Sequence, residues 1–302
     1  MRTTAIRFSS LMLAACALTA LPANAQTPAA PAQPDFSKVE IKTTKVTDNF
    51  YTLEGQGGTI GVLTGPDGVF QVDGQFAPLS EKIAAAIRQV SNGGRLRFLV
   101  NTHLHGDHTG GNENFAKMGT TILARTELRA RLAQAAGTPA AALPMVTYDG
   151  PVTLHLNGEE IELIPILRAH TDGDTLVHFV KADVLMTGDY YRSLGYPNID
   201  RTNGGSLEGM LKGLATTISL AGPNTKIIPG HGATVDRTAV AAHRDMILVL
   251  RDRVAKLVQQ GKTQEEVLAT KVTADYDAKV PGVGTTGDRF IGQLYAELKT
   301  PK

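Results

Sequence analysis

The stretch Thr102-His103-Leu104-His105-Gly106-Asp107-His108-Thr109-Gly110-Gly111 decides how the rest of the chain is interpreted. It holds three histidines and one aspartate between positions 103 and 108, and it follows the apolar run Leu96–Val100, which predicts a short buried strand. Buried imidazoles and carboxylates need polar partners, so such a cluster is poor packing material. The same groups are good ligands for a borderline-soft divalent ion such as zinc. The stretch therefore predicts a metal-binding loop at the end of a strand.

The spacing inside this loop predicts two metal positions. In extended backbone, side chains two residues apart point the same way, so His103 and His105 can hold one ion. Gly106 tolerates unusual backbone angles, which would let the chain turn and direct Asp107 and His108 toward a second ion. The alternative is a polar surface loop that is rich in histidine by chance. The density of imidazoles favours the metal site.

Three more polar residues follow apolar runs further along the chain, each beside a glycine-bearing turn. Residues at the ends of neighbouring strands meet at one edge of a sheet, which is where binding sites are commonly built. We therefore expect these residues to converge on the histidine-rich loop. They are His170 after the run 161–167, Asp189 after 184–186 and His231 after 227–228.

The N-terminus carries the features of an export signal. Arg2 and Arg7 form a positive region, Leu11–Leu21 an apolar core, and Ala23-Asn24-Ala25 a cleavage site. Residues 1–25 are therefore predicted to be a signal peptide, too short and wrongly flanked for a membrane span. The mature chain would begin at Gln26 and be periplasmic or secreted.

A second interpretation of the N-terminus is a lipoprotein signal. Leu13-Ala14-Ala15-Cys16 resembles a bacterial lipoprotein box, in which Cys16 would be lipidated. The apolar stretch continues past Cys16, which favours ordinary cleavage. Cys16 is the only cysteine, so a chain cleaved after Ala25 has no disulfide and no thiolate ligand or nucleophile.

Composition bounds the class of protein. The chain has 302 residues, 42% hydrophobic and 20% charged, which is typical of a globular protein with a sizeable core. It has 30 basic and 29 acidic residues. Loss of Arg2 and Arg7 would leave 30 − 2 = 28 basic residues and a formal charge near −1. There is no basic stripe, so we expect a small-molecule substrate, no nucleic-acid partner and no transmembrane segment.

The mature chain is predicted to be an α/β (α+β) protein. Residues 26–37 are a Pro/Ala-rich linker, and residues 38–260 form one domain of two similar successions of strands and helices, Val39–Thr147 and Val152–Leu250. Two sheets with helices outside give a four-layer αββα sandwich. Residues 261–302 are predicted to be a C-terminal helical extension, with a capping box formed by Thr263 and Glu266.

These motifs together resemble the metallo-β-lactamase superfamily. The resemblance rests on H-x-H-x-D-H at His103–His108, Ala169-His170-Thr171, Gly188-Asp189 and Pro229-Gly230-His231-Gly232, and it covers about Phe50 to Met246. It implies the αββα sandwich and a pair of zinc ions. The implied ligands are His103, His105 and His170 for the first zinc, Asp107, His108 and His231 for the second, and Asp189 bridging both.

Differences from the true β-lactamases indicate which members of the superfamily this chain resembles more. One subclass has arginine at the position of His108 and cysteine at that of Asp189, and this chain has neither. The subclass with H-x-H-x-D-H usually lacks the bridging aspartate. The complete ligand set is more similar to glyoxalase II and related hydrolases of esters, thioesters, lactones or phosphodiesters. An export signal argues against a cytoplasmic glutathione thioester as substrate.

The ligand set implies a mechanism. Two divalent ions can share one water and lower its pKa toward about 7, giving a bridging hydroxide that attacks a carbonyl. Asp107 or Asp189 would relay a proton to the leaving group. The prediction is an exported dinuclear-zinc hydrolase of an ester, thioester, lactone or lactam. The alternatives are a true metallo-β-lactamase, an iron-dependent redox enzyme of the same superfamily, and a metal-binding protein without catalysis.

Residues around the ligands have weaker assignments. Arg192 stands three positions after Asp189, where related lactamases have a lysine that holds a substrate carboxylate. An anionic substrate would follow, whereas the alternative is a surface arginine. Tyr191, with Tyr190 and Tyr196, would line a pocket or pack a loop.

Ligand histidines usually donate their second N–H to a carboxylate or a carbonyl. The candidates for this role are Asp73, Asp172 and Asp174, each of which could instead form a turn. The histidines at 155, 178 and 243 are predicted to be structural, and the loops 137–145 and 192–206 to govern selectivity.

Overall fold

A computed structural model describes residue 1 and residues 35–280 and 284–299. The predicted signal peptide, with Cys16, and the linker up to residue 34 lie outside the described residues. From Phe36 onward the chain forms one compact unit. Its first element is the short 3-10 helix η1 (Phe36–Lys38), so regular structure begins two residues before the predicted domain boundary.

The first sheet takes its strands in chain order. Strands β1 to β4 are antiparallel, and β4 to β7 are parallel. Parallel neighbours need crossover connections, and helices supply them here. The strands are β1 (Lys42–Lys45), β2 (Phe50–Glu54), β3 (Ile60–Leu63), β4 (Val69–Val72), β5 (Leu96–Val100), β6 (Thr121–Arg125) and β7 (Val146–Tyr148). The helices are η2 (Ala77–Leu79), α1 (Ser80–Val90), α2 (Gly106–Thr109), α3 (Asn112–Lys117), α4 (Thr126–Gln134) and η3 (Ala140–Ala142).

The second sheet has the order β12-β11-β10-β9-β8. Because β10 is antiparallel to β9 and β11, and β11 is parallel to β12, the strands β9, β11 and β12 all end at one edge. The strands are β8 (Val152–Leu156), β9 (Glu159–Ile166), β10 (Asp174–Phe179), β11 (Val184–Met186) and β12 (Lys226–Ile228). Between β11 and β12 lie η4 (Gly188–Tyr190), η5 (Arg201–Asn203) and α5 (Leu207–Leu220), and α6 (Arg237–Gln259) follows β12.

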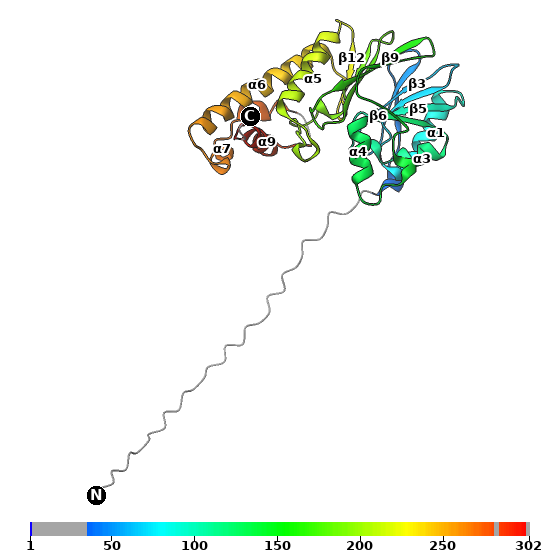
Figure 1. The fold of residues 1–302 in the computed structure, drawn as a ribbon. Helices are drawn as coiled ribbons and strands as arrows, with labels where there is room; N and C mark the ends of the chain where they lie inside the picture. The colour runs from blue at the N-terminus through cyan, green and yellow to red at the C-terminus, as the bar shows by residue number, and fades with distance from the viewer. Residues whose placement is uncertain (2–34, 281–283, 300–302) are drawn as a thin grey trace. The chain divides into compact units, whose positions relative to one another are not determined.

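Three apolar clusters join the sheets and helices into four layers (Figure 1). Between the sheets, the ring of Phe179 on β10 lies 4.6 Å from that of Phe50 and 6.0 Å from that of Phe70. On the outer face of the first sheet, Ile83 of α1 and Phe115 of α3 are fully buried. Helices α5 and α6 cover the outer face of the second sheet. The four-layer αββα sandwich predicted from the sequence is confirmed.

The helices after Gly261 belong to the same core as the second sheet. They are α7 (Gln264–Ala269), α8 (Ala274–Asp277) and α9 (Gly287–Lys299). Val267, Phe290 and Leu294 are fully buried in the cluster that includes Leu250 of α6. The capping box of Thr263 and Glu266 is present at the start of α7. In the part of the chain that the structure describes, no helix is long and apolar enough to cross a membrane.

Two parts of the fold depart from the sequence prediction. The first succession was expected to begin at Val39, but its first strand is β1, which begins at Lys42 and has four exposed side chains. Strand β7 was not predicted; two of its three residues are exposed, and it lies at the edge of its sheet. Edge strands with little buried surface leave a weak alternation in the sequence.

Candidate metal centre

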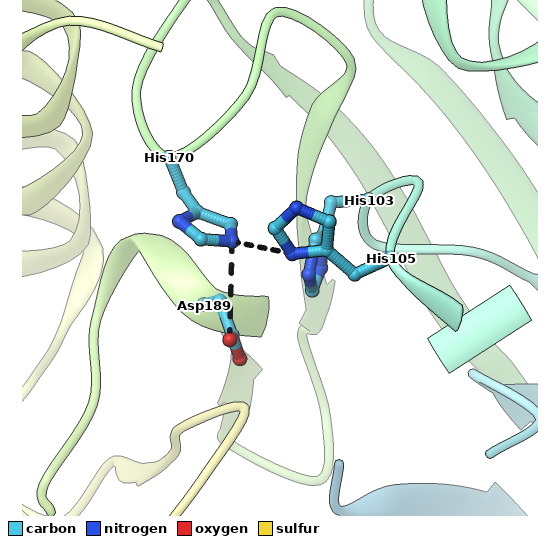
Figure 2. A group of neighbouring side chains, drawn as sticks. All are labelled: His103, His105, His170 and Asp189. Carbon is cyan, nitrogen blue, oxygen red and sulfur yellow. Dashed lines mark hydrogen bonds and ion pairs between the residues drawn. The ribbon is translucent and has the colours of Figure 1, made fainter. Parts of the chain in front are cut away.

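The seven candidate ligands meet at the edges where their strands end. His103 and His105 follow β5, and the three downstream residues follow β9, β11 and β12, which end together. Within each of two groups, the candidate ligand atoms lie within 4.8 Å of one another. The first group, drawn in Figure 2, is His103, His105, His170 and Asp189, and the second group is Asp107, His108 and His231.

Asp189 lies between the two groups. Its Oδ1 is 3.4 Å from Nε2 of His108 and 3.4 Å from Nε2 of His231. Its Oδ2 is 3.9 Å from Nε2 of His170. The two carboxylate oxygens therefore face different groups, as a bridging ligand requires.

The change of direction inside the histidine-rich loop has a different cause from the one expected. Gly106 does not have a positive φ. It is the first residue of the helical turn α2, which follows His105, itself in extended backbone. Because a helical turn rotates successive side chains by about 100°, Asp107 and His108 leave the direction that His103 and His105 share. Gly106 therefore contributes no unusual angle here.

Asp73 orients the imidazole of His108. Its Oδ2 accepts a hydrogen bond from His108 Nδ1 at 2.7 Å, and its oxygens also accept from the backbone N–H and the hydroxyl of Thr102. Since the Thr102 hydroxyl donates to Asp73, it accepts from His103 Nδ1, 3.1 Å away. These bonds hold both rings so that, in the neutral form of each histidine, Nε2 carries the free lone pair.

Two partners of ligand histidines come from the segment after η4 and were not found by sequence reasoning. His105 donates from Nε2 to Asp200 Oδ2 at 2.8 Å, and His170 donates from Nδ1 to the carbonyl of Asn198 at 2.7 Å. The remaining nitrogens, His105 Nδ1 and His170 Nε2, lie 2.9 Å apart and face the first group. Neither Asn198 nor Asp200 belongs to a motif, so the sequence holds no signal for them.

The C-terminal helix α9 holds this segment in place. Gln293 accepts a hydrogen bond from the backbone N–H of Ile199 at 3.0 Å and donates one to the Asn198 side chain at 2.8 Å. Asp200 also donates its backbone N–H to the carbonyl of His170. A residue of the C-terminal extension thus contacts the segment that orients two candidate ligands.

Charges inside the site oppose the effect of burial. Burial alone would raise the pKa of Asp107, but the His231 hydrogen bond and the charge of His108 lower it to about 2. Burial also acts to raise the pKa of Asp189, and His108 holds that pKa well below its usual value. Burial lowers the pKa of His103, and it lowers that of His170 to about 4. Both carboxylates are ionised and two imidazoles neutral near pH 7, the forms that bind metal.

Two glycines let backbone approach the ligands. A side chain at Gly58 would collide with the His108 ring, and one at Gly230 would collide with Asp189 Oδ1. Gly58 donates its backbone N–H to the carbonyl of Asp107 at 3.1 Å, and Thr59 donates to that of Gly230 at 2.8 Å. The loop before β3 is therefore hydrogen-bonded both to the histidine-rich loop and to the segment that carries His231.

The donor set fits a divalent metal ion. Nε2 of His103 and Oδ1 of Asp189 are buried and have no hydrogen-bond partner among the described residues. Buried polar atoms are normally satisfied, so these two indicate a missing partner between them. Imidazole nitrogens and carboxylate oxygens suit zinc and its neighbours, and a tetrahedral ion with bonds of about 2 Å spaces its ligands by about 3.4 Å. The separation of the His108 and His231 nitrogens, 3.4 Å, matches this spacing.

A family model described as the metallo-beta-lactamase superfamily matches residues 56–231, more than half of the chain and the span of all seven ligands. The chain belongs to the metallo-β-lactamase superfamily. The fold prediction and the resemblance stated from the motifs are both confirmed.

Solved structures with this superfamily fold are similar at low identity. The DIM-1 metallo-β-lactamase has a TM-score of 0.61 at 22% identity, over 70% of this chain and 99% of that one. A metallo-β-lactamase from Pontibacter korlensis has a TM-score of 0.59 at 17% identity, over 69% and 99%. The inverting sec-alkylsulfatase Pisa1 from Pseudomonas sp. has a TM-score of 0.66 at 18% identity, over 84% of this chain but only 50% of that longer one. At these identities the likeness shows the fold.

Other residues singled out from the sequence lie apart from the ligand atoms of this superfamily site. Asp172 pairs with Arg131, at 2.7 and 2.6 Å, and not with an imidazole. Asp174 accepts from the backbone N–H of His170 and from Thr171, so it fixes the turn that carries His170. Of the three aspartates considered, Asp73 alone accepts a hydrogen bond from a candidate ligand ring.

The proposed substrate contacts are placed less favourably. Tyr191 is buried in the core, with its ring 5.0 Å from that of His243, which makes packing the simpler account of it. Tyr190 donates to or accepts from Thr217, and Tyr196 bonds Asp277. Arg192 is half-buried, its guanidinium lies near Gly284, and its Nε has no partner among the described residues. No contact places Arg192 or Tyr191 against the ligand groups.

Proposed function

We propose that this protein is an exported dinuclear-zinc hydrolase that cleaves an ester, thioester, lactone or lactam. The observation that carries the proposal is the position of Asp189, whose two oxygens face two separate groups of imidazole and carboxylate ligands. When bound, a pair of zinc ions would acidify a shared water and polarise the bond to be cleaved. His103, His105 and His170 would hold one ion, Asp107, His108 and His231 the other, and Asp189 both.

The chain's own residues prepare this chemistry. Three imidazoles donate hydrogen bonds to Asp73, Asp200 and the Asn198 carbonyl, which turns the other nitrogen of each ring inward, so no reorientation is needed on binding. Asp107 is ionised and 26% exposed, and its Oδ2 lies 3.0 Å from His231 Nε2. It is the one candidate ligand carboxylate open to solvent, so it would be the group that passes a proton to the departing atom.

The experiment is metal analysis combined with a substrate panel. Zinc-loaded protein would be tested side by side on a chromogenic cephalosporin, a lactone, an acyl thioester, an activated carboxylic ester, a phosphodiester and a secondary alkyl sulfate. We expect two zinc ions per chain and turnover of at least one carbonyl substrate, with Asp107→Ala lowering kcat by about a hundredfold or more. Asp67→Ala, an exposed aspartate in the turn before β4, is the matched control.

Each of the three rivals has its own outcome in the same experiment, and bound zinc without turnover of any substrate would indicate a metal-binding protein without catalysis. Rapid cleavage of the cephalosporin alone would indicate a true metallo-β-lactamase. Iron in place of zinc, with no hydrolysis, would indicate a redox enzyme. Full activity in Asp107→Ala would overturn the assignment of the site. Export by residues 1–25 is tested separately, by the N-terminus of protein recovered from the periplasm of a producing cell.

A further inference from the structure

A cavity of about 540 Å³ lies beside the metal centre, between residues 198–202 and the C-terminal helices. His105 forms part of its wall, and so do Asn198 and Asp200, the two residues that orient candidate ligands. Its volume falls in the range of about 300 to 1,000 Å³ typical of small-molecule sites. The cavity therefore adjoins the first ligand group.

One face of α9 forms the opposite wall. Arg289, Gly292, Gln293 and Ala296 all line the cavity. Their spacing of three, four and seven residues places them on one side of a helix. Two of these four positions carry little side chain, since Gly292 and Ala296 are small. The cavity is therefore not filled by side chains at these two positions.

Gly292 has no local reason to be glycine. It lies inside α9, where glycine costs about 1 kcal/mol relative to alanine. It does not have a positive φ. A Cβ at this position would lie 3.2 Å from Nε2 and 3.9 Å from Cδ of Gln264, a tight contact that the flexible end of this side chain can relieve, and it would lie within 4 Å of no atom of a core residue outside α9. The space left by the missing side chain belongs to the cavity.

Charges in the wall leave one cation available. Asp200 is hydrogen-bonded to His105, Arg201 pairs with Glu297, and Asp288 pairs with Lys271. Arg289 is exposed, and its guanidinium has no hydrogen bond or ion pair within residues 35–280 and 284–299. A negatively charged ligand group in the cavity would find this cation without displacing an existing partner.

We propose that this cavity binds the part of the substrate that is not cleaved, with Gly292 setting its depth and Arg289 pairing with a carboxylate on the substrate. The proposal rests on the hydrolase function and names the substrate class of the same site: esters or thioesters whose acyl part ends in a carboxylate. Both residues contact the bound substrate away from the reacting bond. Substitution of either residue therefore raises KM and leaves kcat nearly unchanged.

The test uses mono-p-nitrophenyl glutarate and its methyl ester, which differ by the one charge. We expect Arg289→Gln to lower kcat/KM for the charged ester about tenfold through KM, as the loss of one charge-assisted contact predicts. The methyl ester should change by less than about twofold, and Arg289→Lys, which keeps the charge but not the planar fork, should recover part of the loss. Arg237→Gln, an exposed arginine at the start of α6, is the control. Gly292→Leu should raise KM for both esters, and Gly292→Ala by less.

A binding measurement separates this proposal from the hydrolase function. The amide analogue N-(p-nitrophenyl)glutaramate would be titrated calorimetrically into the wild type, Arg289→Gln and Gly292→Leu, after metal content is shown to be equal in all three. The wild type could cleave neither ester and still bind the analogue, with both variants binding it about tenfold more weakly. That result would contradict the proposed hydrolase function and support the cavity as a binding site. Equal binding by all three proteins, or no binding by the wild type, overturns the cavity proposal.

Discussion

The two ligand groups differ in how firmly the chain holds them. In the first group, His103 and His170 are 1% and 0% exposed and His105 is 27% exposed, and all three imidazoles contact a partner that is not a ligand. In the second group, His108 is 0% exposed and bonded to Asp73. By contrast, Asp107 is 26% and His231 18% exposed, and neither has such a partner among the described residues. The ring of His231 contacts Asp107 and Asp189, which are candidate ligands themselves. The side chains of the first group are therefore oriented before a metal ion binds, whereas the orientation of the second group depends more on the ion that it would hold.

This difference predicts two unequal affinities. Ligands that are already oriented lose less conformational entropy on binding, so the first ion should bind more tightly and leave later when a chelator is added. The following experiments test the comparison, from the largest expected effect to the smallest.

Asp189→Ala should affect both groups at once. It removes the one residue whose oxygens face both, so we expect hydrolysis to fall by about a thousandfold or more, and bound metal to fall from two ions toward one. Steady-state kinetics and elemental analysis measure the two effects. A variant that keeps two ions and most of its activity would show that Asp189 is not shared.

Asp73→Asn should weaken the second group more than the first. The Asp73 carboxylate accepts hydrogen bonds from His108 Nδ1 and from the backbone N–H and hydroxyl of Thr102, and an amide cannot accept all three. Loss of such a partner typically lowers metal affinity about 10- to 100-fold. Competition with a chromogenic chelator measures both affinities. Asp172→Asn, which loses a pair with Arg131 and no contact to a ligand ring, is the control. Equal loss in the two variants would count against an orienting role.

Gln293→Ala should have the opposite selectivity. Its two hydrogen bonds hold the segment whose Asn198 carbonyl and Asp200 carboxylate orient His170 and His105. We expect the first affinity to fall about tenfold and the second to stay, with a changed absorption spectrum of cobalt-substituted protein. Gln293→Glu keeps the acceptor for the Ile199 N–H and should recover part of the effect. Gln260→Ala, an exposed glutamine at the end of α6, is the control. An unchanged spectrum would contradict the role of α9.

A histidine outside both groups supplies the smallest expected effect. Burial lowers the pKa of His243 to about 4. The unfolded chain takes up this proton near pH 6.5, so the contribution to stability is complete above pH 6.5 and declines as the pH falls toward 4. Because Nε2 of His243 is buried but the residue as a whole is only half-buried, we expect His243→Phe to abolish about 1 kcal/mol of destabilisation between pH 7 and 5. Unfolding of metal-free protein measures it.

The same substitution at exposed His155 on β8 provides the comparison for His243→Phe. A pH dependence that is identical in both variants would show that the buried imidazole is not the acid-sensitive group.

The sequence predicted the architecture because its strongest signals are local. The apolar run Leu96–Val100 lies within a single element, and it appears as β5. The seven candidate ligands were found because four lie in the loop after this run and the other three each follow an apolar run of their own. Strand direction then brought them together, which is a property of the sheet and not of any one segment.

The partners of the ligands could not be predicted in the same way. Asp73 was noticed because it follows β4, but Asp200 and Asn198 lie in an irregular segment, and Gln293 lies 95 residues from Asn198. Hydrogen bonds between distant segments depend on how the layers pack, which leaves no periodicity to read. Gly106 shows the limit within a motif: the loop turns through ordinary helical geometry, which the glycine only suggested.

The backbone hydrogen bonds of Gly58 and Thr59 join the segment of Asp107, which follows β5 of the first sheet, to that of Gly230, which follows β12 of the second. Metal ions bound between the same two segments would fasten the sheets to each other along that edge. The free energy of metal binding would then add to the free energy of unfolding of the whole sandwich. A chain stripped of its ions should retain its secondary structure yet become more open to proteases between the sheets.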